Sequence, residues 1–182
     1  MEDQTAITTY LSFIINDEKF AVNVAKVLEV LQKQPISPVP NTPDYFQGVI
    51  NFRGEIIPVI DTRIKLGLSG IQLEENFVII VIEIRTETDQ IVVGAIVDRV
   101  KDVITINQDQ IMPVPKMNNK VKSDFFTGIV RVKDGFIIII NFDKIIISED
   151  AILLSEFTQA SEQIINEIKE KELEEINQET KE

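Results

Sequence analysis

The sequence predicts a mainly β protein, folded as two packed barrel lobes with short connecting helices and a C-terminal helix. Three observations lead to this prediction. Apolar residues make up 44% of the 182-residue chain and are rich in Ile and Val, whose branched side chains fit pleated strands. Short apolar runs alternate with turn residues as far as residue 148. The two halves of this stretch repeat similar elements in the same order, which indicates an internal duplication.

The first half predicts two hairpins and a short helix. Tight turns at Asn16–Asp17 and Arg53–Gly54 each join two strands. Prolines between Pro35 and Pro43 break regular pairing and predict an extended connector. Asp61 is placed to cap the helix, which Gly67 ends. The predicted strands are Tyr10–Ile15, Lys19–Val24, Val27–Leu31, Gly48–Phe52 and Glu55–Ile60, and the helix is Arg63–Leu66.

The second half repeats this arrangement. It begins with strands at Phe77–Ile84 and Ile91–Val97, joined by a turn at Thr86–Gln90. Four later segments match segments of the first half, at offsets that grow from 73 to 81 residues. Ordered matches of this kind are what duplication followed by loop insertion leaves. The matched pairs are Val27–Val30 with Val100–Val103, Ser37–Pro40 with Met112–Pro115, Gly48–Val49 with Gly128–Ile129, and Arg53–Gly54 with Asp134–Gly135.

The chain divides into a tail at residues 1–7, a two-lobed domain at residues 8–148 and a C-terminal segment. The duplication places the boundary between the lobes near residues 69–76, with the alternative that the chain crosses back to the first lobe near its end. Residues 149–182 hold 11 acidic residues and three lysines, and their apolar residues follow helical spacing. They predict an acidic amphipathic helix with a frayed tail. The apolar stripe consists of Ala151, Leu154, Phe157, Ser161, Ile164 and Ile168.

Composition excludes several classes of function. The chain has no Cys and no His, so it lacks thiol nucleophiles, imidazole acid–base groups and the usual zinc ligands. A formal net charge of −12 argues against nucleic acid and against anionic membranes as partners. The lack of Cys fits a reducing compartment, and the first ten residues lack the basic and apolar stretches of a secretory signal, so we expect a cytoplasmic protein. The longest apolar runs are too short to cross a bilayer, so we expect no membrane insertion.

Catalysis and cofactor binding find no support in the sequence. Paired carboxylates could act without histidine, but the candidate carboxylates lie at strand ends and turns, and no spacing singles out a pair. The chain has only seven glycines, and none forms a glycine-rich loop leading into a helix. We therefore expect no enzyme activity, no cofactor and no metal. The carboxylates considered were Glu29, Glu55, Asp61, Asp98 and Asp102.

The segment Gly48–Arg63 carries the most specific pattern. Its turn at Asn51–Gly54 is followed by an apolar strand that ends in Asp61–Arg63. This pattern resembles the signature of CheW-like chemotaxis coupling proteins, in which an Asn-Leu-Arg-Gly turn precedes a strand ending in Asp-Leu-Arg. Phe52 and Thr62 stand where the family usually has Leu. The resemblance extends from Thr8 to Ser148 through Val27–Val30, Pro40–Pro43, Val93–Val100 and Thr127–Gly128.

The resemblance implies two five-stranded barrels similar to SH3 domains and an adaptor function without catalysis. Proteins of this family bind the regulatory domain of the histidine kinase CheA, itself a CheW-like fold, and the cytoplasmic tip of methyl-accepting chemoreceptors. They support receptor arrays beneath the inner membrane. One alternative is a specialised CheW-like adaptor of another motility or sensory system. Another is a small-molecule-binding β-barrel. A CheV-type protein is disfavoured, because no receiver-like segment with an acidic pocket follows residue 148.

Arg53 is the strongest candidate for a partner contact, because its planar fork of donors suits carboxylates and backbone carbonyls. Glu29 is expected either to contact the partner as well or to pair with Arg53 and brace the first barrel. Strand alternation places Val27 and Glu29 on one, partner-facing side and Val30 in the core, while a second interpretation puts both valines in the core. The other candidates are Phe52, Gly54 and Ile56.

Overall fold

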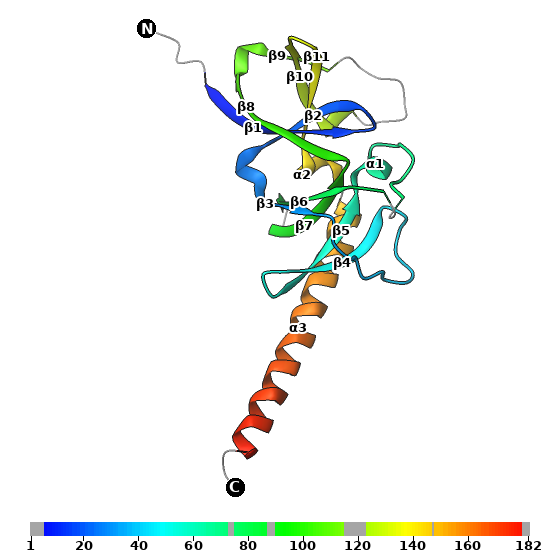
Figure 1. The fold of residues 1–182 in the computed structure, drawn as a ribbon, viewed down its shortest axis with the longest axis vertical. Coiled ribbons are helices and arrows are strands. Elements are labelled where there is room, and N and C mark those ends of the chain that lie inside the picture. The colour runs from blue at the N-terminus through cyan, green and yellow to red at the C-terminus, as the bar shows by residue number, and fades with distance from the viewer. Residues whose placement is uncertain (1–5, 73–74, 87–89, 115–122, 147, 180–182) are drawn as a thin grey trace.

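The protein has a two-lobed β body from which one long helix extends (Figure 1). The computed structural model describes residues 6–72, 75–86, 90–114, 123–146 and 148–179. Residues 1–5 of the predicted tail, residues 87–89 of the predicted turn and Pro115 lie outside this range. The mainly β class, the two lobes and the C-terminal helix are confirmed.

Lobe A is a six-stranded sheet in the order β8-β1-β2-β11-β10-β9, and lobe B is a five-stranded sheet in the order β3-β6-β7-β5-β4. The additional strand of lobe A is β9, which has only two residues. The strands of lobe A are β1 (Ile7–Ile15), β2 (Glu18–Asn23), β8 (Arg99–Asn107), β9 (Ile111–Met112), β10 (Phe126–Val132) and β11 (Gly135–Ile140). Those of lobe B are β3 (Val27–Gln32), β4 (Phe46–Phe52), β5 (Glu55–Asp61), β6 (Val78–Arg85) and β7 (Gln90–Val97).

Each half of the chain contributes strands to both lobes. The β1–β2 hairpin belongs to lobe A, but the chain then crosses over and β3 pairs with β6 of lobe B. In the second half the β6–β7 hairpin belongs to lobe B, and β8 crosses back to pair with β1. Parallel pairing of β5 with β7, and of β11 with β2, completes the exchange.

The predicted boundary near residues 69–76 is therefore wrong as a boundary between lobes. It separates β5 from β6, which both lie in lobe B. It does separate the two repeated halves of the sequence. The repeat and the lobe differ because strand pairing is decided by contacts between distant segments, which local patterns do not report. The alternative was that the chain returns to the first lobe near its end. The chain does return to lobe A, and it does so from β8 onward.

The matched segments occupy equivalent places in the two lobes. Ser37 bridges Val49 on β4, and the corresponding Met112 pairs with Ile129 on β10. The short helices α1 (Thr62–Lys65) and α2 (Phe142–Ile145) each follow the second hairpin of their half. Asp61 caps α1 and Asn141 caps α2, each through a side-chain oxygen. Three further single turns of 3-10 helix, η1 (Val24–Lys26), η2 (Gln108–Gln110) and η3 (Ser123–Phe125), lie in the connections.

The largest apolar cluster joins the two lobes. It contains Phe13 and Phe20 of lobe A, Ile80 of lobe B and Phe142 of α2, all of them buried. The Phe13 ring lies 6.1 Å from that of Phe20 and 6.5 Å from that of Phe142. Each lobe also has one smaller apolar cluster in its outer part. The lobes thus share one core, and neither has a complete interior of its own.

Helix α3 (Ser148–Glu179) packs its first turns on lobe B and then leaves the body (Figure 1). Leu154 is fully buried, and the Phe157 ring lies 5.5 Å from that of Phe46 on β4. The sequence predicted a frayed tail, but the helix continues to Glu179. Glu and Lys, which dominate this part, have high helix propensity, and this accounts for the extra turns.

We predict that Gly48→Ala destabilises the protein much more than Gly54→Ala. Both glycines have positive φ, 138° and 87°, so both changes carry a backbone cost of about 1–2 kcal/mol. A Cβ at Gly48 would also lie 2.2 Å from the Ser37 carbonyl oxygen, whereas one at Gly54 meets nothing within 4 Å. We expect this clash to add about 1–3 kcal/mol. Denaturant unfolding measures the difference, and equal losses would contradict the predicted close approach.

Candidate protein-interaction site

The turn between β4 and β5 holds Arg53 at the tip of a hairpin. Arg53 and Gly54 both have positive φ, 55° and 87°, as a two-residue turn with the twist of the flanking strands requires. The backbone N–H of Gly54 donates to Oδ1 of Asn51 over 3.0 Å, which fixes the turn from within. The hairpin therefore presents the Arg53 side chain at the surface of lobe B.

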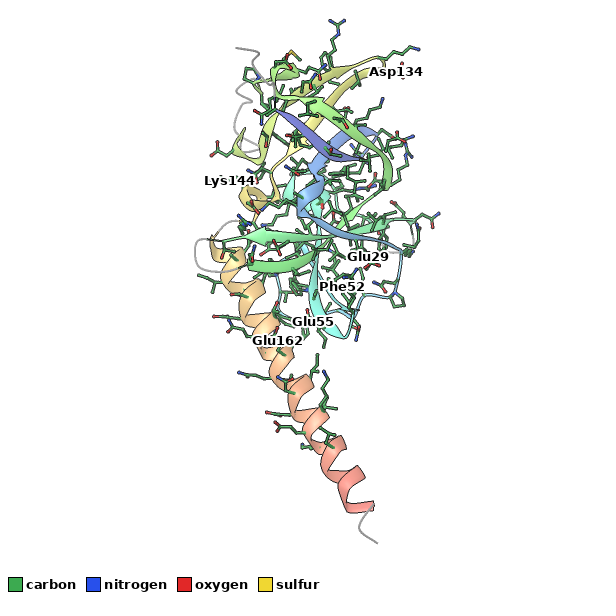
Figure 2. The ribbon with its side chains drawn as sticks, turned by 90° about the vertical axis from the view of Figure 1, so that its left-hand side faces the viewer. Glu29, Phe52, Glu55, Asp134, Lys144 and Glu162 are labelled. Carbon is green, nitrogen blue, oxygen red and sulfur yellow. The ribbon has the colours of Figure 1, made fainter. Side chains whose placement is uncertain are left out.

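Arg53, in the turn between β4 and β5, pairs with Glu29 on β3. Its Nη2 and Nε donate to Oε2 of Glu29 over 2.8 Å and 3.2 Å, and its guanidinium lies 4.9 Å from the centre of the Phe52 ring. The side chains remain 69% and 40% exposed, so an exposed pair of this kind contributes only about 0.2–1 kcal/mol. Figure 2 shows Glu29 and Phe52 at the end of lobe B where α3 leaves the body. The predicted internal pair is present, and it leaves donors of Arg53 open to solvent.

The two valines of β3 lie opposite to the predicted arrangement. Val30 is 37% exposed, while Val27 is half-buried against the shared core. The prediction that Val30 faces the core, and the interpretation that both valines do, are wrong for Val30. The side chains of β3 alternate regularly between half-buried and exposed, so the expected alternation is present and only the side assigned to the core was wrong. Leu28, which the sequence did not single out, is 43% exposed beside them.

The remaining candidates divide between core and surface. Phe52 is 8% exposed and belongs to the outer apolar cluster of lobe B. Ile56 is half-buried, and Gly54 is exposed at the turn. Phe52 thus supports the hairpin from inside, and of these three only Gly54 is freely accessible.

Lobe A exposes an apolar side chain at the place equivalent to Val30. Val103 on β8 is 62% exposed, and the duplication matches it with Val30 on β3. These two strands are the ones that cross between lobes. Val103 was not among the expected surface residues, because its match Val30 was itself expected to face the core. Figure 2 places the tip of the other hairpin, marked by Asp134, at the far end of lobe A.

Two ion pairs link the lobes at matching positions with their charges exchanged. Arg63 on α1 pairs with Asp98 between β7 and β8 over 2.7 Å, and Asp98 also accepts the N–H of Asn16 in lobe A. On the other side Lys26 pairs with Asp143 on α2 over 2.7 Å, and Asp143 accepts the N–H of Arg85 in lobe B. Each carboxylate thus ties a helix or crossover to the hairpin of the opposite lobe.

The burial of these pairs gives them more weight than the Arg53–Glu29 pair. The side chains of Arg63 and Asp98 are 16% and 17% exposed. The hydrogen bond to Asp98 raises the pKa of Arg63 above its ordinary value. The sequence placed Asp98 only at a turn or strand end, because nothing local connects it with a helix 35 positions earlier.

Comparison with known proteins now identifies the family. The model of the CheW-like domain matches residues 9–150, most of the chain. The chain belongs to the CheW family. It is 32% identical to the chemotaxis protein CheW of Klebsiella aerogenes over 151 residues, which cover 83% of this chain and 89% of that protein. It is 34% identical to CheW of Thermotoga maritima over 136 residues, covering 75% and 85%.

A solved structure agrees with the fold of this CheW-family chain. The scaffolding protein TtCheW from Thermoanaerobacter tengcongensis superposes with a TM-score of 0.69 at 30% identity, and the match covers 80% of this chain and 96% of that one. The two lobes are thus the SH3-like lobes of CheW proteins. The chain is a chemotaxis scaffolding and coupling protein and not an enzyme.

Three of the carboxylates considered for catalysis have structural partners. Oδ1 of Asp61 accepts the N–H of Arg63 over 2.8 Å, and its Oδ2 accepts that of Ile71 over 2.7 Å. Asp98 holds Arg63 and Glu29 holds Arg53. Within the described residues no group of three or more Asp or Glu side chains could hold a metal ion. None of the described helices is long and apolar enough to cross a membrane.

A third charged cluster fixes the start of α3 on lobe B. Lys65 pairs with Asp150 over 2.5 Å and lies 3.7 Å from the centre of the Tyr45 ring. Burial, together with a hydrogen bond to Asp150, raises the pKa of Tyr45 above its ordinary value, so its hydroxyl keeps its proton. The side chains of Lys65 and Asp150 are only 12% and 8% exposed. The orientation of α3 is therefore set by this cluster and by Leu154.

We predict that Arg63→Ala lowers stability clearly more than Arg53→Ala. Loss of Arg53 removes an exposed pair and costs less than about 1 kcal/mol. Loss of Arg63 leaves Asp98 largely buried without its cation, which we expect to cost about 1.5–3 kcal/mol. Urea unfolding of both variants checks the order. If Arg53→Ala proves the more costly change, the Arg53–Glu29 pair is primarily a brace of lobe B.

Proposed function

We propose that this protein joins the cytoplasmic tip of a methyl-accepting chemoreceptor to the regulatory domain of a CheA-type histidine kinase. The proposal is supported chiefly by the match of the family domain to the whole two-lobed body. A body with a shared core and two inter-lobe ion pairs is a rigid piece that can hold two partners at a fixed distance. The location that follows from these partners is the cytoplasm, at receptor arrays beneath the inner membrane.

The kinase contact is proposed to bring barrel against barrel. The regulatory domain of CheA is itself expected to have a CheW-like fold, so its lobes expose ends similar to those of this chain. Apolar side chains exposed on the crossing strands, such as Val30 and Val103, are suited to the centre of such a contact, since burial there removes them from water. Each contact in an array can be modest, because many copies act together.

Receptor coupling is proposed to depend on Arg53 and Glu29. The exposed guanidinium keeps donors free that the single Glu29 oxygen does not use. A carboxylate or backbone carbonyl of a receptor helix could receive these donors or compete for the pair. Val27, Phe52, Gly54 and Ile56 then act by shaping the hairpin and β3 beneath the pair.

The first prediction of this proposal concerns the kinase. Mixed with the purified regulatory domain of a CheA kinase from the same source, the chain should elute with it as one complex in size-exclusion chromatography with light scattering. Separate elution at tens of micromolar, where a complex of micromolar Kd would persist, would count against kinase coupling. It would direct attention to the alternative of a CheW-like adaptor in another motility or sensory system.

The second prediction concerns the receptor. Arg53→Ala should weaken binding to receptor tips by about tenfold or more, since a hydrogen bond to a charged group is worth about 1.5–3 kcal/mol. Lys133→Ala is the matched control, because Lys133 is an exposed cation in the two-residue turn between β10 and β11 of lobe A. Sedimentation with receptor-containing membranes measures both. Equal loss in the two variants would indicate a general charge effect and not a contact made by Arg53.

A further inference from the structure

Helix α3 carries one apolar stripe with two different environments. After Ala151 the stripe continues with Leu154, Phe157, Ser161, Ile164 and Ile168, whose spacings of three and four place them on one face. The first three of these residues pack on lobe B: Leu154 and Ser161 are buried, and Phe157 contacts Phe46. The last two extend past the body, where Ile164 is 56% exposed and Ile168 51% exposed. The same face that docks on lobe B thus continues without a cover in the described part of the chain.

This exposed part lies outside the family domain. The CheW-like model ends at residue 150, whereas α3 continues to Glu179. From Ser161 to Glu179 the extension is about 30 Å of helix, at about 1.5 Å per residue. A helix of this length offers room for a partner helix of several turns. The partner surfaces proposed above do not include it.

The negative charge around this face favours a basic partner helix over a second copy of α3. Residues 162–182 hold eight acidic residues and three lysines, a net charge of −5. Glu167 is exposed next to Ile168, and Glu162 and Glu170 are exposed on the same part of the helix. A second copy of α3 would bring glutamates against glutamates in either orientation, and like charges disfavour such pairing. A helix flanked by Lys or Arg would meet these positions with opposite charge.

We propose that the exposed stripe at Ile164 and Ile168 docks a cationic amphipathic helix of a partner protein. The two isoleucines supply the apolar contact, and the flanking glutamates select a basic partner and set its alignment. The stripe is separate from the proposed kinase and receptor contacts. It adds a third interaction surface to the chain.

The probe is a synthetic helix of about three heptads with Leu at the a and d positions and Lys at the e and g positions. A second peptide with the same core and Glu at e and g controls for charge. Binding to the full chain is measured by fluorescence anisotropy. We expect the Lys peptide alone to bind, and less tightly as salt rises from about 0.1 M to about 1 M, where screening shortens from about 10 Å to about 3 Å.

The variant Ile164→Ala/Ile168→Ala should weaken binding of the Lys peptide at least tenfold. Ala has the highest helix propensity, so a loss cannot be ascribed to fraying of α3, and circular dichroism checks this. Ile152→Ala is the matched control, because Ile152 is 58% exposed on the opposite face of the same helix. It should bind as the unchanged chain does.

Three results would overturn the proposal. One is the absence of Lys-peptide binding at about 100 µM, a concentration that detects even weak complexes. Another is equal binding by the double variant or by the Glu peptide. The third is a dimer of the chain in light scattering that the double variant loses, since the occupant would then be a second copy. Co-elution with the kinase domain is a separate measurement and does not depend on these outcomes.

Discussion

The exchange of strands between the two halves is the constraint on which the rest of the structure depends. Because β3 pairs with β6 and β8 pairs with β1, neither half can complete a lobe alone. The crossing strands bring Phe13, Ile80 and Phe142 into one apolar cluster. Separating the two halves of the chain would break both sheets and expose this cluster, so the body is expected to unfold as one cooperative unit.

The inter-lobe ion pairs refine an arrangement that the strand exchange has already set. Arg63–Asp98 and Lys26–Asp143 lie at equivalent places, and each carboxylate also accepts a backbone N–H from the opposite lobe. The charges are exchanged between them: the cation lies on the helix in the Arg63–Asp98 pair, and the carboxylate lies on the helix in the Lys26–Asp143 pair. Fixed lobe geometry is what a scaffolding protein needs, because it transmits the position of one partner to another.

The proposed contact surfaces fall into two groups, those within the family domain and the one on helix α3 beyond it. The Arg53 hairpin and the crossing strands belong to the family domain and carry the proposed coupling contacts. Helix α3 begins as part of the body, where Asp150 and Leu154 hold it, and its later turns form an exposed, acidic helix that extends away from the body. Its exposed Ile164 and Ile168 continue the spacing of the buried Leu154 and Ser161, so one continuous face serves both the fold and the proposed partner helix.

The sequence by itself determined the fold class, the hairpins, the duplication, the amphipathic helix and the family, because these follow from local patterns of branched residues, turns and spacing. It also anticipated the Arg53–Glu29 pair as one of two alternatives. Only the tertiary structure decided which strands share a lobe, since pairing between distant strands leaves no local signal. The same reason hid the Arg63–Asp98 pair and the exposure of Val30: one joins residues 35 positions apart, and the other depends on which side of β3 faces the core once β3 pairs with β6.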